Sequence, residues 1–150
     1  MAHARAQIRD AVVSALTGLT TTGSRVYSGR TRALAKDHQP SLLVYATSET
    51  SDVDASGRKL LRILLLVVEG RVVATGASAA SDIESTLDTV ASEVEARLTR
   101  EPSLGGLAQE LTLTRTVINA VSPGESHAGE VRMEFRVAYR TRETEPQTAV

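Results

Sequence analysis

The histidines are the first residues to test for chemistry, because a neutral imidazole binds metal ions and exchanges protons near neutral pH. The sequence holds three of them, His3, His38 and His127, and none has another histidine three or four residues further along. Each lies near a terminus or in an expected loop, where a solvated histidine is the usual finding. The histidines therefore predict no metal site.

Acidic side chains are the second possibility, because paired carboxylates carry out acid–base catalysis. One segment carries a run of them: Asp82, Glu84, Asp88, Glu93 and Glu95. Solvated helix faces commonly carry such runs. The chain has no cysteine, no HExxH or P-loop pattern and no GxSxG elbow, and Gly105-Gly106 lacks the spacing of a dinucleotide fingerprint. We therefore predict no catalytic residue, no cofactor and no enzymatic activity.

Composition narrows the classes of partner. The 150 residues fit one domain with a substantial core, which we expect over residues 1–141, followed by a short polar tail over residues 142–150. A net charge of −1 and an aromatic content of 3% without tryptophan argue against free nucleic acid as a ligand. The N-terminal segment MAHARAQIRD contains no apolar run, so neither a signal peptide nor a membrane partner is expected.

The longest aliphatic run, residues 59–69, predicts the element that must position the rest of the chain. Its β-branched residues and the glycine that follows favour a strand over a buried helix. Along a strand, Leu64 and Leu66 would lie on one face, and Ile63 and Leu65 on the other. Both faces are apolar, so we expect a central strand covered on both sides. The chain's own helices can cover one side, and the other needs more of this chain or a neighbouring subunit.

Apolar residues recur at helical spacing over residues 3–17 and 79–100, which predicts a helix in each segment. Further strands are expected over residues 25–28, 41–48, 111–121 and 131–141. A turn or a bulge is expected at Gly70-Arg71, turn chemistry at Pro123 to Ser126, and a projecting acidic loop over residues 49–57. The order α-β-β-β-α-β-β is typical of the α+β class, here a mostly antiparallel sheet covered by two helices.

Charge distribution points to candidate surfaces. Bases without acids occupy residues 25–36, and acids dominate residues 82–101. A solvated surface is the simpler explanation, because exposed charges contribute little to stability. The alternative is a subunit interface in which the acidic patch of one copy meets the basic patch of the next, as a head-to-tail ring requires. The candidate interface residues are Arg25, Arg30, Arg32, Asp82, Glu84, Asp88, Glu93 and Glu95.

The last two strand segments have two-faced patterns. In residues 111–121 we expect one face to carry Leu111, Leu113, Val117 and Val121. In residues 131–141 the pattern alternates between an apolar face and a charged one. The charged face consists of Arg132, Glu134, Arg136 and Arg140.

Taken in order, these segments resemble the tail terminator proteins of tailed bacteriophages. The resemblance spans nearly the whole chain, and none of its motifs is a catalytic signature. It lies in IRDAVVSALTGLTTTGSRVYSGR (8–30), PSLLVYATSE (40–49), LLRILLLVVE (60–69), DTVASEVEARLTREPSLGGLAQELTLTRT (88–116) and VRMEFRVAYRT (131–141).

The resemblance implies a structural virion protein. Such proteins form a hexameric ring on the head-proximal end of the tail tube, where they end tube polymerisation and join the tail to the head. The implied partners are further copies of the chain, the tail tube protein, head–tail connector or neck proteins, and DNA that passes through the lumen without sequence-specific binding. The implied location is the neck-proximal tail of the virion, and the host cytoplasm during assembly.

The resemblance also assigns roles to candidate residues. In this family a long loop between strands is mobile in the free subunit and ordered in the ring. Here that loop would contact the tube or neck through Glu49, Asp52, Val53 and Asp54. If the sheet lines the ring, Arg132, Glu134, Arg136 and Arg140 would border the lumen.

Two other functions remain open from the sequence. One is a head-closure or tail-completion ring protein of the neck, which belongs to the same broad class. The other is a small enzyme with a cleft between helix and sheet. An enzyme would need a convergent polar cluster in a pocket, and the sequence pattern offers none.

Overall fold

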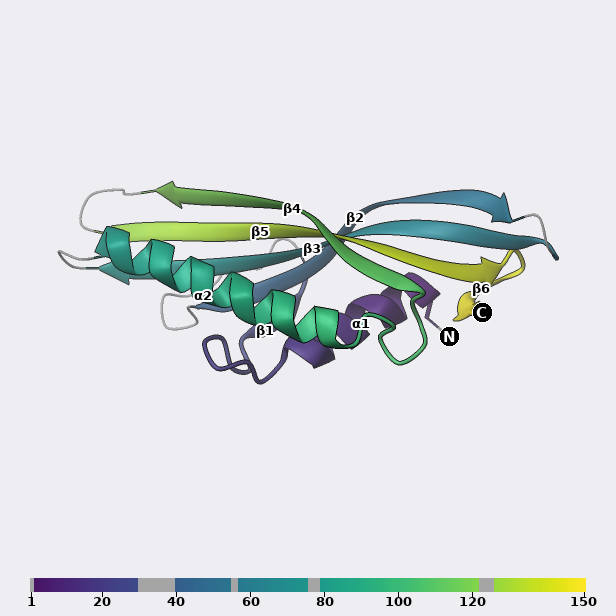
Figure 1. Ribbon diagram of the computed structural model, residues 1–150, viewed down its shortest axis with the longest axis horizontal. Coiled ribbons are helices and arrows are strands. Elements are labelled where there is room, and N and C mark those ends of the chain that lie inside the picture. The colour runs from purple at the N-terminus through teal and green to yellow at the C-terminus, as the bar shows by residue number, and fades with distance from the viewer. Residues whose placement is uncertain (1, 30–39, 55–56, 76–78, 122–125) are drawn as a thin grey trace.

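The computed structural model describes residues 2–29, 40–54, 57–75, 79–121 and 126–150, and it shows two helices packed on one face of a six-stranded sheet (Figure 1). The elements are α1 (Ala4–Leu16), β1 (Val26–Ser28), β2 (Ser41–Asp54), β3 (Lys59–Thr75), α2 (Ala79–Arg100), β4 (Glu110–Val121), β5 (Ser126–Arg142) and β6 (Glu145–Ala149). The α+β class is confirmed, with one strand more than the sequence predicts.

Strand β3 is central, as its two apolar faces predict. The order in the sheet is β1-β2-β3-β5-β4, and β6 pairs with β5. Strand β1 runs parallel to β2, and the other pairs are antiparallel. Pairing with β5 extends along the whole of β3, from Lys59 opposite Arg142 to Thr75 opposite Ser126. Two partners satisfy the backbone groups of this long apolar strand.

Both helices bury an apolar stripe with helical spacing. Helix α1 begins after His3, whose Nδ1 accepts a hydrogen bond of 3.2 Å from the backbone N–H of Arg5 and so acts as the N-cap. The buried residues of the stripes are Ala4, Ile8, Val12 and Leu16 in α1, and Ile83, Leu87, Val90, Val94 and Leu98 in α2. They pack on Leu64, Leu66 and Val68 of β3, which define the helix face of the sheet. The opposite side, which carries Leu61, Ile63, Leu65 and Val67, is the second face.

Two glycines let α2 approach the sheet closely. A Cβ on Gly70 would lie 3.0 Å from methyl groups of both Val131 and Val90. A Cβ on Gly129 would lie only 2.5 Å from Cγ2 of Ile83 and 3.0 Å from Cδ1 of Leu87. The expected turn or bulge at Gly70-Arg71 is therefore wrong. This glycine lies inside β3, opposite Val131, where the helix leaves no room for a side chain.

We expect Gly129→Ala to lower the free energy of unfolding by about 1–3 kcal/mol, because the added methyl overpacks a filled core. Chemical denaturation measures the loss. Ile83→Ala removes the clashing methyl, so the double variant Gly129→Ala/Ile83→Ala should lose less stability than the two single losses added together. Simple additivity would show that Gly129 serves some purpose other than helix approach.

Two expectations about chain ends and loops need correction, and a third concerns residues that are mostly not described. Residues 49–54 belong to β2 instead of a projecting loop, because they pair with residues 59–64 of β3 in a long hairpin. The expected polar tail contains β6, which pairs with the end of β5 and whose Gln147 carbonyl accepts a 2.7 Å hydrogen bond from the Gln7 amide. Of the turn predicted at Pro123 to Ser126, residues 123–125 lie outside the described residues.

A bulge in each of two strands changes which face the following side chains occupy. In β2 the register shifts between Ala46 and Ser48, so Glu49 lies opposite Leu64 on the helix face. Without the extra residue, strict alternation would have placed the Glu49 carboxylate on the second face.

In β4 the register shifts between Leu113 and Arg115. Leu113 therefore shares the helix face with Phe135, whereas Val117 lies opposite Arg132 on the second face. The expectation that Leu111, Leu113 and Val117 share one face is wrong, because the bulge inserts one residue between them.

Candidate interaction surfaces

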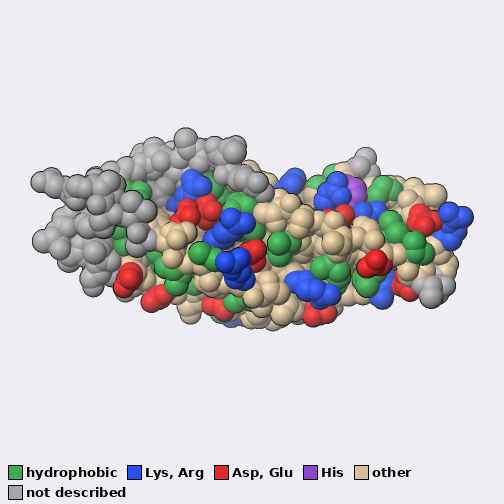
Figure 2. All heavy atoms as spheres, turned by 90° about the horizontal axis from the view of Figure 1, so that it is seen from above, with side chains coloured by type: hydrophobic (Ala, Val, Ile, Leu, Met, Phe, Trp, Pro, Cys, Tyr) green, Lys and Arg blue, Asp and Glu red, His purple; other side chains and the backbone are tan. Residues whose placement is uncertain are grey.

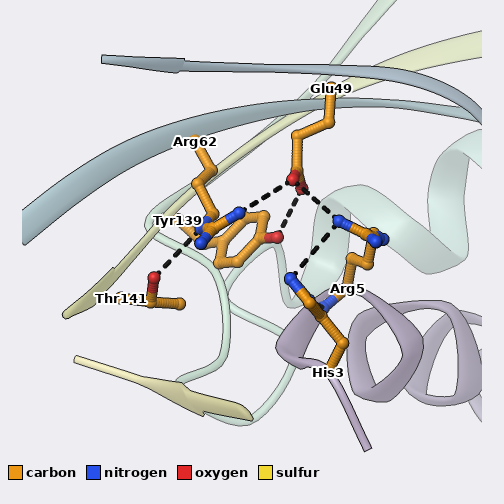
Figure 3. A network of polar contacts seen from close by, with 6 residues as sticks. All are labelled: His3, Arg5, Glu49, Arg62, Tyr139 and Thr141. Atoms are coloured by element: carbon orange, nitrogen blue, oxygen red, sulfur yellow. Dashed lines mark hydrogen bonds and ion pairs between the residues drawn. The ribbon is translucent and has the colours of Figure 1, made fainter. Parts of the chain in front are cut away.

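A polar cluster lies under the N-terminal end of α1, where the β2–β3 hairpin leaves the helix layer (Figure 3). Its centre is Glu49, whose side chain is only 10% exposed. The carboxylate accepts hydrogen bonds of 3.1 Å from both Arg5 and Arg62, and a further bond from the hydroxyl of Tyr139. Arg62 also donates to the hydroxyl of Thr141, at 3.0 Å. The cluster therefore joins α1 to the β2, β3 and β5 strands.

Burial in this cluster shifts two titratable groups. It raises the pKa of the Tyr139 hydroxyl well above its usual range, and the hydrogen bond to Glu49 raises that pKa further. Burial also lowers the pKa of His3, and the neighbouring Arg5 lowers it again. Both shifts favour the neutral side chain at neutral pH. Because the Glu49 carboxylate already has three donors, the arrangement is that of a structural anchor rather than a site for substrate.

The second face of the sheet carries an apolar surface on its central strands. Leu43, Tyr45 and Val67 form a buried cluster there, with Tyr27 packed against it. Further along β3, the side chains of Leu61, Ile63 and Leu65 are only half-buried. Both helices contribute to the core of the helix face, whereas the described cluster of the second face consists of strand residues alone.

A buried acid lies at one end of this apolar surface. Glu69 is 6% exposed and accepts a 3.1 Å hydrogen bond from the hydroxyl of Tyr45. Arg71 holds the other carboxylate oxygen at 2.7 Å. Arg132 lies opposite Glu69 on β5, and its buried Nε has no hydrogen-bond partner among the described residues. This end of the second face is thus charged but internally compensated.

The predicted lumen residues do lie on the second face, but most of them are paired within the chain. Arg140 contacts Asp54 at 2.7 Å, Arg136 contacts Glu110 at 3.6 Å, and Glu134 contacts Arg115 at 3.7 Å. The three bases and one acid of β5 therefore share this face with acids of β2 and β4. The result is a surface of mixed charge instead of a positive one.

The predicted interface residues separate into internal and exposed groups. Arg25 donates to the carbonyls of Pro40 and Thr21, at 2.7 and 3.0 Å, and so belongs to the internal support of β1. Glu93 accepts hydrogen bonds from the backbone N–H and hydroxyl of Thr21. Asp82, Glu84, Asp88 and Glu95 are exposed on α2, and Arg30 and Arg32 lie outside the described residues.

The predicted contact residues lie on the hairpin. Glu49 is inside the polar cluster and Asp54 is bound to Arg140, whereas Asp52 and Val53 are exposed. Val53 is 69% exposed, the largest value among the large hydrophobic residues described as exposed. In Figure 1 this end of the β2–β3 hairpin extends beyond both helices. The hairpin thus presents an aliphatic side chain on one face of β2 and an acid on the other.

A groove lies between α1 and the C-terminal end of α2, with a volume of about 510 Å³. Its lining consists of Ala11, Ala15, Arg97, Leu98, Arg100, Glu101, Leu104 and Gly105. Arg97 donates to the Ala15 carbonyl at 2.9 Å and so ties the two helices together. The sequence gives no signal for this groove, because its lining residues come from separate segments.

Metal sites and membrane-spanning helices are both absent from the described residues. These residues contain no group of three or more His, Cys, Asp or Glu side chains that could hold a metal ion. None of their helices is long and apolar enough to cross a membrane. On the face shown in Figure 2, acidic and basic side chains are interspersed instead of forming a patch of one sign.

Comparison with known proteins gives a likeness to solved structures but no sequence match. No protein-family model matches the chain, and no curated protein sequence matches it. Among solved structures, the chain is similar to one from the virion of a native gene transfer agent particle. The two share 17% sequence identity and a TM-score of 0.44, over 91% of this chain and 92% of the other.

Proposed function

We propose that this protein is a structural virion protein, a tail terminator, that caps the head-proximal end of a phage tail tube as a ring. The ring ends polymerisation of the tube protein and offers a surface to the connector or neck proteins of the head. The role is not enzymatic and needs no cofactor. The sequence resemblance suggests this assignment, and one feature of the fold supports it.

The supporting feature is the apolar second face of β3. Leu61, Ile63 and Leu65 lie on the central strand of the sheet, yet a single copy leaves them half-buried. Aliphatic groups in contact with water raise the free energy of the protein, by roughly 25 cal/mol for each Å² exposed. A neighbouring subunit that covers this stripe removes that cost, and the ring provides such a neighbour in every position.

The proposed ring has six copies joined head to tail, so each interface brings together two different patches. The exposed acids of α2, Glu84, Asp88 and Glu95, form one candidate patch, and the basic segment of residues 25–36 supplies charges for the other. The hairpin end with Asp52 and Val53 is engaged by a partner in the assembled tail. These contacts order the subunits without a binding site for a small molecule.

As an alternative to cover by a neighbouring subunit, the charged second face of β5 suits the wall of a channel for DNA, because Arg136 lies opposite Leu65 on the same face. A strongly positive wall would hold phosphates, because each neutralised phosphate adds salt-dependent affinity. Here Arg136 and Arg140 are paired with acids of neighbouring strands. Such a mixed wall lets DNA pass without sequence-specific binding.

We expect Arg136→Glu to assemble normal rings but to alter the rate of DNA ejection, if this face borders the lumen. The Arg136 side chain is 42% exposed, so the folded subunit tolerates the change. The control is the charge-swapped variant Arg136→Glu/Glu110→Arg, which restores the local ion pair. Rings that fail to form would place Arg136 in a subunit interface, and normal assembly with normal ejection would exclude both roles.

Tail length tests the proposed function. Deletion of the gene for this protein should yield tail tubes of irregular, excessive length. Addition of the purified protein should restore a single tube length in electron micrographs. Tubes of normal length that fail only to join heads would instead identify a head-closure or tail-completion protein. Normal particles without the protein would contradict both.

A further inference from the structure

The chain exposes two surfaces that are complementary to each other. One is the hairpin end, where Val53 is 69% exposed and Asp52 beside it is exposed as well. The other is the groove between α1 and α2, whose floor includes the buried side chains of Leu98 and Leu104. An exposed aliphatic side chain and an apolar groove are complementary, because burial of apolar surface is the dominant driving force of protein association.

Charge is complementary as well. Asp52 takes part in none of the ion pairs among the described residues, and the same holds for Arg100 on the rim of the groove. Arg97 adds a second positive charge to the groove, against the single acid Glu101. Opposite charges at the rim favour a correctly oriented encounter more than they add affinity.

The groove has a defined shape before any partner arrives. Arg97 ties α2 to α1, and the turn that forms one wall is closed by backbone hydrogen bonds from Gly106 and Ala108 to the Ser103 carbonyl, at 3.0 and 2.9 Å. Leu104 in this turn adopts a φ of +49°, which a leucine side chain rarely does. A pre-formed hollow costs less to occupy than one that must open on binding.

One chain cannot fill its own groove with its own hairpin. In Figure 1 the hairpin end extends beyond both helices. The groove instead lies between α1 and the C-terminal end of α2. The high exposure of Val53 confirms that it has no such contact within the subunit. Because the two surfaces differ, a contact between them is head-to-tail and repeats from copy to copy, as a ring requires.

We infer that the hairpin end of one subunit docks end-on in the α1–α2 groove of the next copy, so that Val53 on one face of β2 contacts the apolar lining and Asp52 on the other face meets Arg100. This inference rests on the proposed ring for its biological meaning, and it names the partner that engages the hairpin. The contact itself is a property of the isolated protein and is tested there.

Disulfide trapping tests the contact directly, because the chain contains no cysteine of its own. The double variant Val53→Cys/Ala15→Cys, oxidised at high protein concentration, should give a ladder of cross-linked oligomers on a non-reducing gel. The control variant Ile118→Cys/Ala15→Cys carries a cysteine at another exposed aliphatic position, 54% exposed, and should give only background. A Val53 ladder no stronger than this control would overturn the inference.

A charge swap tests the same contact independently and without cysteines. Asp52→Arg and Arg100→Asp should each weaken self-association by about two- to five-fold, the range of an exposed ion pair. An equimolar mixture of the two variants should regain association through the restored pair. If the mixture associates no better than either variant alone, Asp52 and Arg100 do not meet. These outcomes are separate from tail capping, so a ladder with uncapped tails would refute the proposed function and leave the contact standing.

Discussion

Glu49→Ala is expected to destabilise the protein by about 3–5 kcal/mol, the usual loss when one member of a buried ion pair is removed. The substitution leaves Arg62, 10% exposed, without its carboxylate and also frees the Tyr139 hydroxyl. For a chain of this size the melting temperature should fall by about 10–20 °C. Thermal unfolding followed by circular dichroism measures the change.

Two controls separate the cost of the unpaired charge from general damage. Glu49→Ala/Arg62→Met removes both charges and should recover part of the lost stability, because no buried cation then remains unpaired. Asp54→Ala breaks the half-exposed pair with Arg140 and should cost less than about 1 kcal/mol. Equal losses for Glu49→Ala and Asp54→Ala would contradict the role of the cluster as an anchor.

Leu65→Lys is expected to leave the subunit folded and to abolish ring formation. Leu65 is half-buried on the second face of β3, so a lysine can extend its amine into solvent in the free subunit. In a covered interface the same amine would be buried without a partner, which costs several kcal/mol. Since every interface of a ring repeats the defect, assembly should fail completely.

Circular dichroism and native mass spectrometry on one sample test this separation of fold from assembly. The matched control is Asp10→Lys, which adds a lysine at an exposed position of α1 and should assemble normally. If Leu65→Lys forms rings as the control does, a neighbouring subunit does not cover the second face.

The strongest sequence patterns predicted their elements well. The stripe from Ile83 to Leu98 locates α2, because one buried face repeats over many helical turns. The two apolar faces of residues 59–69 likewise predict β3 at the centre of the sheet. In both cases the signal is local, so neighbouring residues in the sequence carry all of it.

The hairpin and the last strand were missed for a common reason. Acidic residues of β2 are accommodated by bases on other strands, such as Arg140 of β5, which forms an ion pair with Asp54, and no local window contains both partners. Strand β6 is polar because it lies at an edge, where side chains meet water. Composition therefore suggested loops where cross-strand contacts make strands.

The candidate surfaces were predicted only in part. Runs of charge made α2 and residues 25–36 candidate surfaces, but they did not distinguish internal supports such as Arg25 and Glu93 from exposed acids. The Glu49 cluster depends on a bulge that turns one carboxylate to the helix face. The groove depends on where a turn packs against two helices. Such features arise from tertiary contacts, which spacing along the chain does not encode.

Electron cryomicroscopy of intact tails tests the central claim most directly. We expect a ring of six copies at the head-proximal end of the tube, with the second face of β3 covered by a neighbouring subunit. Labelling the chain with a small fused tag identifies its density, and untagged tails serve as the control. A single copy, a non-cyclic arrangement, or a ring in which Ile63 and Leu65 still face solvent would contradict the account.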